Sequence, residues 1–164
     1  TFTAPAVGGT VTLSPGYYKA GITLAKNATI IMKPGVYSLG GAGLVLSSGA
    51  SLQATNSMIY VAAGALDIDG AGAVNITPPA SGAYRGVSIF QARTDATDGL
   101  LGAGAFNIKG TIYLPKAFLH LAGNGPNYGN QLIVDRLQVD VGANIHFDYA
   151  AAAGSGSGNA YLAE

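Results

Sequence analysis

The first third of the chain contains one short pattern twice. Residues 11–18 read Val-Thr-Leu-Ser-Pro-Gly-Tyr-Tyr, and residues 30–37 read Ile-Ile-Met-Lys-Pro-Gly-Val-Tyr. The prolines of the two copies, Pro15 and Pro34, are 19 positions apart. A unit of about 20 residues is too short to bury its own apolar face, so repeated units must stack on one another. The repeat therefore predicts a solenoid.

Short triplets with an apolar residue on each side of a polar residue or Tyr follow along the chain. Examples lie at residues 66–68, 87–89, 112–114, 119–121 and 137–139. This alternation is typical of strands with one buried and one solvated face. Gly or Pro interrupts the sequence about every 10 to 12 residues, and no long stretch has a helical period. We expect many short strands and very little helix.

The repeat decides between two all-β folds. We predict a single-domain, right-handed parallel β-helix with coils of about 20 residues, and a β-sandwich is the alternative. A sandwich has no reason to repeat a Pro-Gly-Tyr turn at the spacing of one coil, whereas a β-helix stacks like positions. The handedness follows from the preference of parallel strand connections. The expected stacks are Leu13 over Met32, Tyr18 over Tyr37, and Asn27 in one corner with Asn75 and Asn107.

Length and composition restrict the remaining possibilities. The 164 residues form one domain, with the β-helix over residues 1–149 and a flexible Ala/Gly/Ser segment over residues 150–164 that ends in a C-terminal cap. The net charge is zero and 10% of residues are charged, which argues against nucleic acid as a partner. The chain lacks Cys, so disulfides and thiolate metal sites are excluded, and we predict no cofactor. The chain starts without Met, which we interpret as a mature or excised piece of a longer protein.

Polar residues and tyrosines provide candidate binding residues. Arg93 either clamps an acidic sugar, acts as a base, or pairs with Asp95 or Asp98 to hold the following loop, and the ion pair is the preferred interpretation. The tyrosines either stack on sugars or on another protein, or they form rows that reinforce a corner of the solenoid. The candidate binding residues are Arg85, Gln91, Arg93, Asp95, Tyr113 and Tyr128.

Two pairs of residues are weaker candidates for chemistry. Asp67 and Asp69 alternate on one strand, which places them about 6.6 Å apart, within the range that inverting glycosidases use. The alternative is that Asp69 simply ends the strand in a turn. His120 and His146 lie about one coil apart, but without an obvious third ligand they are a weak metal site, and a stacked surface pair is preferred. We therefore predict no catalytic site and no metal site.

Four segments of the chain resemble the C-terminal region of TadE/TadG-like proteins, a bacterial family linked to assembly of tight-adherence (Tad, Flp-type) pili. The aliphatic-acidic end of that family is matched by residues 162–164. The resemblance implies an envelope-associated or extracellular structural protein with an N-terminal membrane segment that this chain lacks. It supplies no catalytic residues. The resembling segments are residues 13–52, 78–93, 106–125 and 131–149.

These expectations combine into one functional hypothesis. The chain is a non-enzymatic structural or adhesive module of the bacterial surface, and its partners are envelope or pilus proteins or surface glycans. Because the ends of a β-helix are unpaired sheet edges, a filament subunit that stacks end to end is one alternative. A β-helix that binds or cleaves polysaccharide, with Asp67 and Arg93 as its candidate residues, is another.

Overall fold

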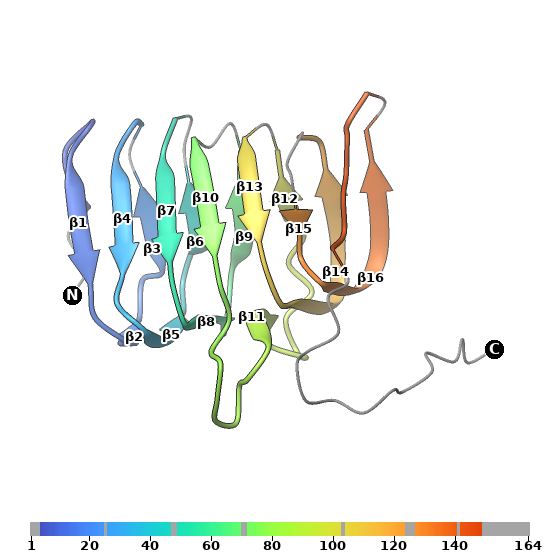
Figure 1. Cartoon of the computed structure of the whole chain (residues 1–164), viewed down its shortest axis with the longest axis horizontal. Helices are drawn as coiled ribbons and strands as arrows, with labels where there is room; N and C mark the ends of the chain where they lie inside the picture. Colours follow the sequence, from blue (N-terminus) through green and yellow to red (C-terminus); the bar gives the residue numbers. More distant parts are fainter. Residues whose placement is uncertain are drawn as a thin grey trace.

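The computed structural model shows an all-β chain in which short parallel strands are stacked coil upon coil (Figure 1). The described part contains no helix that is long and apolar enough to cross a membrane. The structure describes residues 4–24, 26–46, 49–69, 72–102, 104–123, 127–140 and 142–148. The expected C-terminal segment, residues 150–164, lies outside these ranges.

A six-stranded sheet forms one side of the solenoid. Its neighbours along the stack come from successive coils, and every pairing is parallel. In order, its strands are β1 (Thr10–Leu13), β4 (Thr29–Met32), β7 (Ser51–Ala54), β10 (Ala73–Ile76), β13 (Ala105–Ile108) and β15 (Asn127–Tyr128).

A second sheet supplies the other two sides. Its first row is β2 (Gly16–Tyr18), β5 (Gly35–Leu39), β8 (Ser57–Val61) and β11 (Val87–Gln91). Its other row is β3 (Ile22–Leu24), β6 (Gly43–Leu46), β9 (Ala65–Ile68) and β12 (Gly99–Leu101). The long strand β14 (Thr111–Leu121) belongs to both rows and joins them at a corner, and β16 (Gln131–Val139) pairs with β14 as the last strand.

This topology confirms the predicted solenoid and excludes the β-sandwich, because successive coils pair in parallel rather than as two antiparallel layers. The predicted coil length is also confirmed. Thr10 pairs with Thr29 and Thr29 with Ser51, which gives coils of 19 and 22 residues.

One coil is much longer than the others. Ala73 pairs with Ala105, 32 residues later. The extra residues form two loops on either side of β11, residues 77–86 before it and residues 92–98 after it. Figure 1 shows the first of these loops projecting away from the coils below β10 and β11. The two loops therefore border the same strand.

The core consists of apolar rows that run along the solenoid. The predicted stack of Leu13 on Met32 is confirmed, and both side chains are buried. On another side, one row runs from β3 through β6, β9, β12 and β14 to β16. Its members are buried in every strand except β16. That row contains Leu24, Leu46, Ile68, Leu101, Leu121 and Val139.

The repeated Pro-Gly-Tyr pattern has a clear structural role. Gly35 has a φ of +142°, and a Cβ there would lie 2.4 Å from the ring of Pro15 in the preceding coil, so the repeated corner needs glycine. The Tyr of each copy donates a hydrogen bond to the carbonyl before its own proline, Tyr18 to Ser14 and Tyr37 to Lys33. The corner is thus closed by the repeat itself.

Two of the expected stacks need correction. The backbone of Tyr37 pairs with Gly16, not with Tyr18, although the two tyrosine rings do stack at 6.0 Å. Asn75 and Asn107 pair as expected, but Asn27 does not join them. Asn27 instead has a φ of +57° in the turn before β4, a left-handed conformation that Asn tolerates better than most residues.

Two of the predicted triplets differ from the expected pattern of buried and exposed side chains. At residues 87–89 a register shift turns Ser88 inward, where its hydroxyl donates to the carbonyl of Lys109. In the last strand, Leu137 and Val139 occupy inner rows but are 45% and 46% exposed. No described strand lies beyond β16, so no further coil covers these two side chains within the described part of the chain.

Candidate functional site

The candidate site is a strip of aromatic side chains on the outer face of the second sheet. Tyr60 in β8, Phe90 in β11 and Tyr113 in β14 occupy the same position in three successive coils. Each is only partly buried, and each alternates with inward-facing residues of the core. We call Tyr60, Phe90 and Tyr113 the aromatic strip.

The rings of the aromatic strip contact one another along the stack. The centroids of Tyr60 and Phe90 are 5.8 Å apart, and those of Phe90 and Tyr113 are 4.6 Å apart with their planes 26° from parallel. Parallel strands lie 4.7–4.9 Å apart, so aromatic residues at one position of consecutive coils are brought to stacking distance by the backbone. The rings are therefore held in place before any ligand arrives.

Arg93 adds a positive charge to the end of the aromatic strip. Its Nε donates to the Tyr113 hydroxyl at 3.1 Å, and its Cζ lies 5.7 Å from the centre of the Tyr113 ring. The hydrogen bond uses the Nε atom of Arg93, and the contact with the ring uses the face of the guanidinium. Arg93 is exposed, and neither contact is a hydrogen bond from its terminal Nη groups, whose donors can bind an oxygen ligand.

Two loops border the aromatic strip. The loop at residues 77–86 carries Tyr84, which is 48% exposed, and the exposed Arg85. The loop at residues 92–98 carries Arg93. Because the loops lie at opposite ends of β11, Arg93 lies on one long side of the aromatic strip, at its Tyr113 end, and the loop that carries Arg85 joins β11 on the opposite side.

The loop at residues 92–98 is held by Gln91 and by the contact of Arg93 with Tyr113, not by an ion pair of Arg93. Gln91 is 1% exposed and follows Val61 in an inner row, and its Nε2 donates to the carbonyl of Thr97 at 2.8 Å. Asp95 accepts from both the amide and the hydroxyl of Thr97. The preferred prediction of an ion pair from Arg93 to Asp95 or Asp98 is therefore wrong, because Arg93 turns to Tyr113 instead.

Tyr128 does not belong to a binding surface. It is 1% exposed and its ring stacks on Phe106 at a centroid distance of 5.2 Å, so its prediction as an exposed binding residue is wrong. Burial raises the pKa of Tyr128 to about 12. Of the six candidate binding residues, Tyr113 belongs to the aromatic strip and Arg85, Arg93 and Asp95 lie in its bordering loops, whereas Gln91 and Tyr128 are buried.

Asp67 and Asp69 lie in the other row of the second sheet. Asp67 sits on the outer face between Val45 and Leu100 of the adjacent coils, and one of its carboxylate oxygens is buried without a partner among the described residues. Burial raises the pKa of Asp67, and the nearby Asp69 carboxylate raises it further. The two aspartates are thus neighbours, as expected, but they are not part of the aromatic strip.

His120 and His146 do not stack on each other. His120 pairs across the coil with Gln138, and its Nε2 lies 2.6 Å from Oδ1 of Asp140. The hydrogen bonds from His120 and then from Gln138 lower the pKa of Asp140. The backbone of His146 instead accepts from Tyr128 on another side of the solenoid. Among the described residues, no group of three or more His, Cys, Asp or Glu could hold a metal ion.

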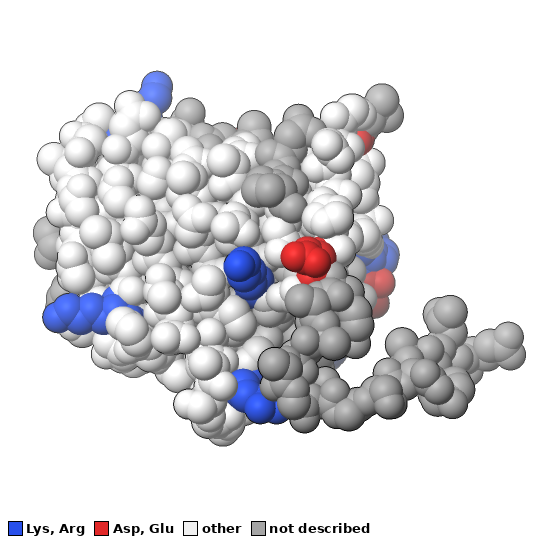
Figure 2. All heavy atoms as spheres, in the orientation of Figure 1, with Lys and Arg blue, Asp and Glu red and all other residues white. Residues whose placement is uncertain are grey.

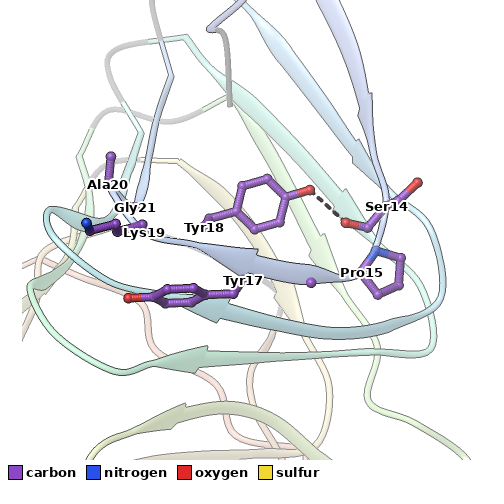
Figure 3. A pocket seen from close by; sticks show the side chains of 8 residues that line it. Ser14, Pro15, Tyr17, Tyr18, Lys19, Ala20 and Gly21 are labelled. Atoms are coloured by element: carbon purple, nitrogen blue, oxygen red, sulfur yellow. Dashed lines mark hydrogen bonds between the residues drawn. The ribbon is translucent and has the colours of Figure 1, made fainter. Parts of the chain in front are cut away.

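Two other surfaces are weaker candidates for a functional site. An open depression at the N-terminal end is lined by residues 14–21 alone, and Figure 3 shows Tyr18 pointing to Ser14 there. Because one segment lines it, groups from different elements do not converge on it. Figure 2 shows that Lys, Arg, Asp and Glu are sparse over the face formed by β1, β4, β7, β10 and β13.

Sequence reasoning missed the central member of the aromatic strip. Phe90 follows the triplet at residues 87–89, whose inward and outward positions were assigned in the wrong register. The signal that could have found it is the alternation Ile89-Phe90-Gln91 beside Ile59-Tyr60-Val61, which places both aromatics outward if the glutamine is accepted as a core residue.

Comparison of the chain with models of known protein families, with curated proteins and with solved structures gives no match. The function proposed below therefore rests on the residues of the chain and their geometry.

Proposed function

We propose that this chain is a non-enzymatic adhesive module of a bacterial surface, which binds an acidic glycan along the aromatic strip. The observation that carries the proposal is the outward stack of Tyr60, Phe90 and Tyr113 with Arg93 at its end. The assignment to an envelope or Tad-type pilus system is supported by the resemblance of four sequence segments to TadE/TadG-like proteins.

The chemistry of the aromatic strip suits a carbohydrate chain. Aromatic rings and their edges pack against the C–H faces of sugars, and tyrosine hydroxyls bind sugar hydroxyls. The strip crosses successive coils, so it offers repeated contacts along the solenoid axis to a repeating polymer. A rigid scaffold that carries its variable loops beside such a strip is a common arrangement for binding.

Both acidic and basic groups lie beside the aromatic strip, but Asp95 and Asp98 already accept hydrogen bonds from Thr97 and from the amide of Phe118. The arginines therefore favour an acidic sugar over a neutral one. Arg93 and Arg85 supply planar donor groups from two different loops. A guanidinium binds a carboxylate through two parallel hydrogen bonds, which gives both affinity and orientation. We therefore expect uronic-acid polymers to bind more tightly than neutral glucans of the same length.

Binding of the whole chain to immobilised acidic and neutral polysaccharides tests the proposal. Arg93→Gln removes a charge-assisted contact worth about 1.5–3 kcal/mol, so affinity for the acidic polymer should fall about tenfold or more. Tyr113→Ala should weaken binding of both classes, because it removes a ring of the strip. Surface plasmon resonance provides the dissociation constants.

Matched controls lie outside the row of the aromatic strip. Phe147 is 38% exposed beside β15 of the other sheet and Lys26 is exposed in a turn, so Phe147→Ala and Lys26→Gln change a comparable ring and charge without touching the strip. Both variants should bind like the original chain. Equal losses in the controls and in Tyr113→Ala, or the absence of any glycan binding, would remove the proposal.

A further inference from the structure

The two ends of the solenoid differ in how well the core side chains are covered. At the N-terminal end, the inner-row residues Ile22 and Leu24 are fully buried although β3 is the last strand of its row. At the C-terminal end, Leu137 and Val139 continue those rows and are 45% and 46% exposed. The same kind of position is therefore covered at one end and open at the other.

An aromatic side chain helps to close the N-terminal end. Tyr18 is partly buried against the core, its ring stacks on Tyr37, and its hydroxyl donates to Ser14 across the coil (Figure 3). The backbone of Tyr18 pairs with Leu39, so it occupies an inner row. At the other end, the corresponding inward position next to Leu114 is occupied by Val134 in β16, which has no aromatic ring to extend over the interior.

The open end also carries an unpaired strand. Among the described residues, β16 pairs with β14 alone, so the N–H and C=O groups on its outer edge have no strand partner. An unpaired edge beside exposed apolar side chains is a template for another strand. The partner must supply both a strand and an apolar end face of matching outline.

We propose that the C-terminal end of the solenoid binds a second copy of this chain, with residues 136–140 of the two copies paired antiparallel about a two-fold axis. A second copy offers the same strand, the same apolar face and the same cross-section. The contact is closed, because it uses one end of each copy, and so it yields a dimer. A head-to-tail filament would instead have to use the N-terminal end, where the core is already covered.

The side chains of this strand favour one register. With Gln138 opposite its own copy, Leu137 faces Val139, and both are inner-row residues. The same register places Arg136 of each copy opposite Asp140 of the other, whose Oδ1 is already bound by His120, so its Oδ2 completes two symmetry-related ion pairs across the dimer. In the single chain, Arg136 lies 3.4 Å from Asp135 at a well-exposed position, where such a pair contributes little.

Sedimentation velocity of the full chain over a concentration series tests the dimer. The original chain should convert from monomer to dimer with increasing concentration and should stop there. Val139→Lys places a charge at the centre of the contact in both copies, so the dimer dissociation constant should rise by at least about tenfold. Ile31→Lys is the matched control, because Ile31 is 38% exposed on the outer face of β4 far from this end.

Mixing two charge variants tests the antiparallel register itself. Arg136→Glu and Asp140→Lys should each weaken self-association, because each places like charges opposite one another. In the mixed dimer, Glu at position 136 faces Lys at position 140, and the native Arg136 faces the native Asp140. The mixture should therefore form dimers more tightly than either variant alone.

Three results would overturn the proposal. The first is a full chain that stays monomeric at every soluble concentration, which would leave the end face to other residues of the chain. The second is growth beyond the dimer, seen as continuous sedimentation of larger species, which would indicate head-to-tail stacking. The third is a dimer that Val139→Lys leaves unchanged or that the charge mixture fails to restore.

Discussion

At the scale of single residues, two buried tyrosines show how position decides whether a buried hydroxyl group stabilises the fold. The single proton of the Tyr37 hydroxyl is shared between the carbonyls of Lys33 at 2.7 Å and Leu13 at 2.9 Å, and so it joins two coils at the repeated corner. The Tyr128 hydroxyl is buried without a hydrogen-bond partner among the described residues. The Tyr37 hydroxyl has hydrogen-bond partners in the folded chain. The Tyr128 hydroxyl loses its contacts with water on folding and gains no partner among the described residues.

Replacing each of these tyrosines by phenylalanine should therefore have opposite effects. Tyr37→Phe should lower the free energy of unfolding by about 1–2 kcal/mol, because the hydrogen bond that the hydroxyl shares between two backbone carbonyls is lost. Tyr128→Phe should leave it unchanged or raise it by up to about 1 kcal/mol, because a desolvated hydroxyl is removed. Urea denaturation of both variants measures the difference. A larger loss in Tyr128→Phe than in Tyr37→Phe would show that the Tyr128 hydroxyl has a partner.

At the scale of the strand, glycine corners set how closely successive coils approach. Gly43 begins β6 with a φ of +78°, and a Cβ there would lie 2.2 Å from the carbonyl oxygen of Ala65 in the next coil. Gly86 has a φ of +82° just before β11, but a Cβ there would meet nothing within 4 Å. The two glycines share a positive φ and differ in what a Cβ would meet.

This pair of glycines separates backbone strain from coil contact. Gly86→Ala should cost about 1–2 kcal/mol, which is the price of a left-handed conformation for alanine. Gly43→Ala should cost at least about 3 kcal/mol, because the backbone of the next coil must also move. Thermal and urea unfolding measure both costs. Equal losses would mean that the coils can separate freely at this corner.

At the scale of the whole molecule, tyrosines near both ends link folding to alkaline pH. Burial raises the pKa of Tyr37 to about 12, with a smaller contribution from Tyr18, and burial alone raises that of Tyr128 to about 12. In the unfolded chain both groups return to the ordinary value of 10.0. Above pH 10.0 the unfolded chain therefore loses phenolic protons that the folded chain retains, and folding becomes less favourable.

Stability should accordingly be complete below pH 10 and should fall as the pH rises from about 10 to about 12. The free energy of unfolding, measured in urea at a series of alkaline pH values, gives this slope. The double variant with Tyr37→Phe and Tyr128→Phe should show a shallower decrease, because both linked protons are absent. An identical decrease in the double variant would assign the effect to lysines or to the backbone.

The features of the fold that the sequence predicts are those specified by its repeat. Pro15 and Pro34 mark equivalent corners, and their spacing predicts coil length, parallel stacking and rows such as Leu13 on Met32, all of which the structure confirms. A repeat makes these features local, because each coil specifies the next one through the same short contacts. Arg93 and Tyr113 were likewise identified as candidates from residue type alone.

The tertiary structure decided what lies outside the repeat. Whether Gln91 faced the core, Arg93 turned to Tyr113, Tyr128 was buried or His120 met Asp140 depended on the register after the longest coil, which a bulge and two loops displace. A shift of one residue exchanges the two faces of a strand, so the sequence could name these side chains but not their neighbours. The exposed end at Leu137 and Val139 is likewise a property of the finished stack, because a side chain in an inner row is covered only if another coil follows.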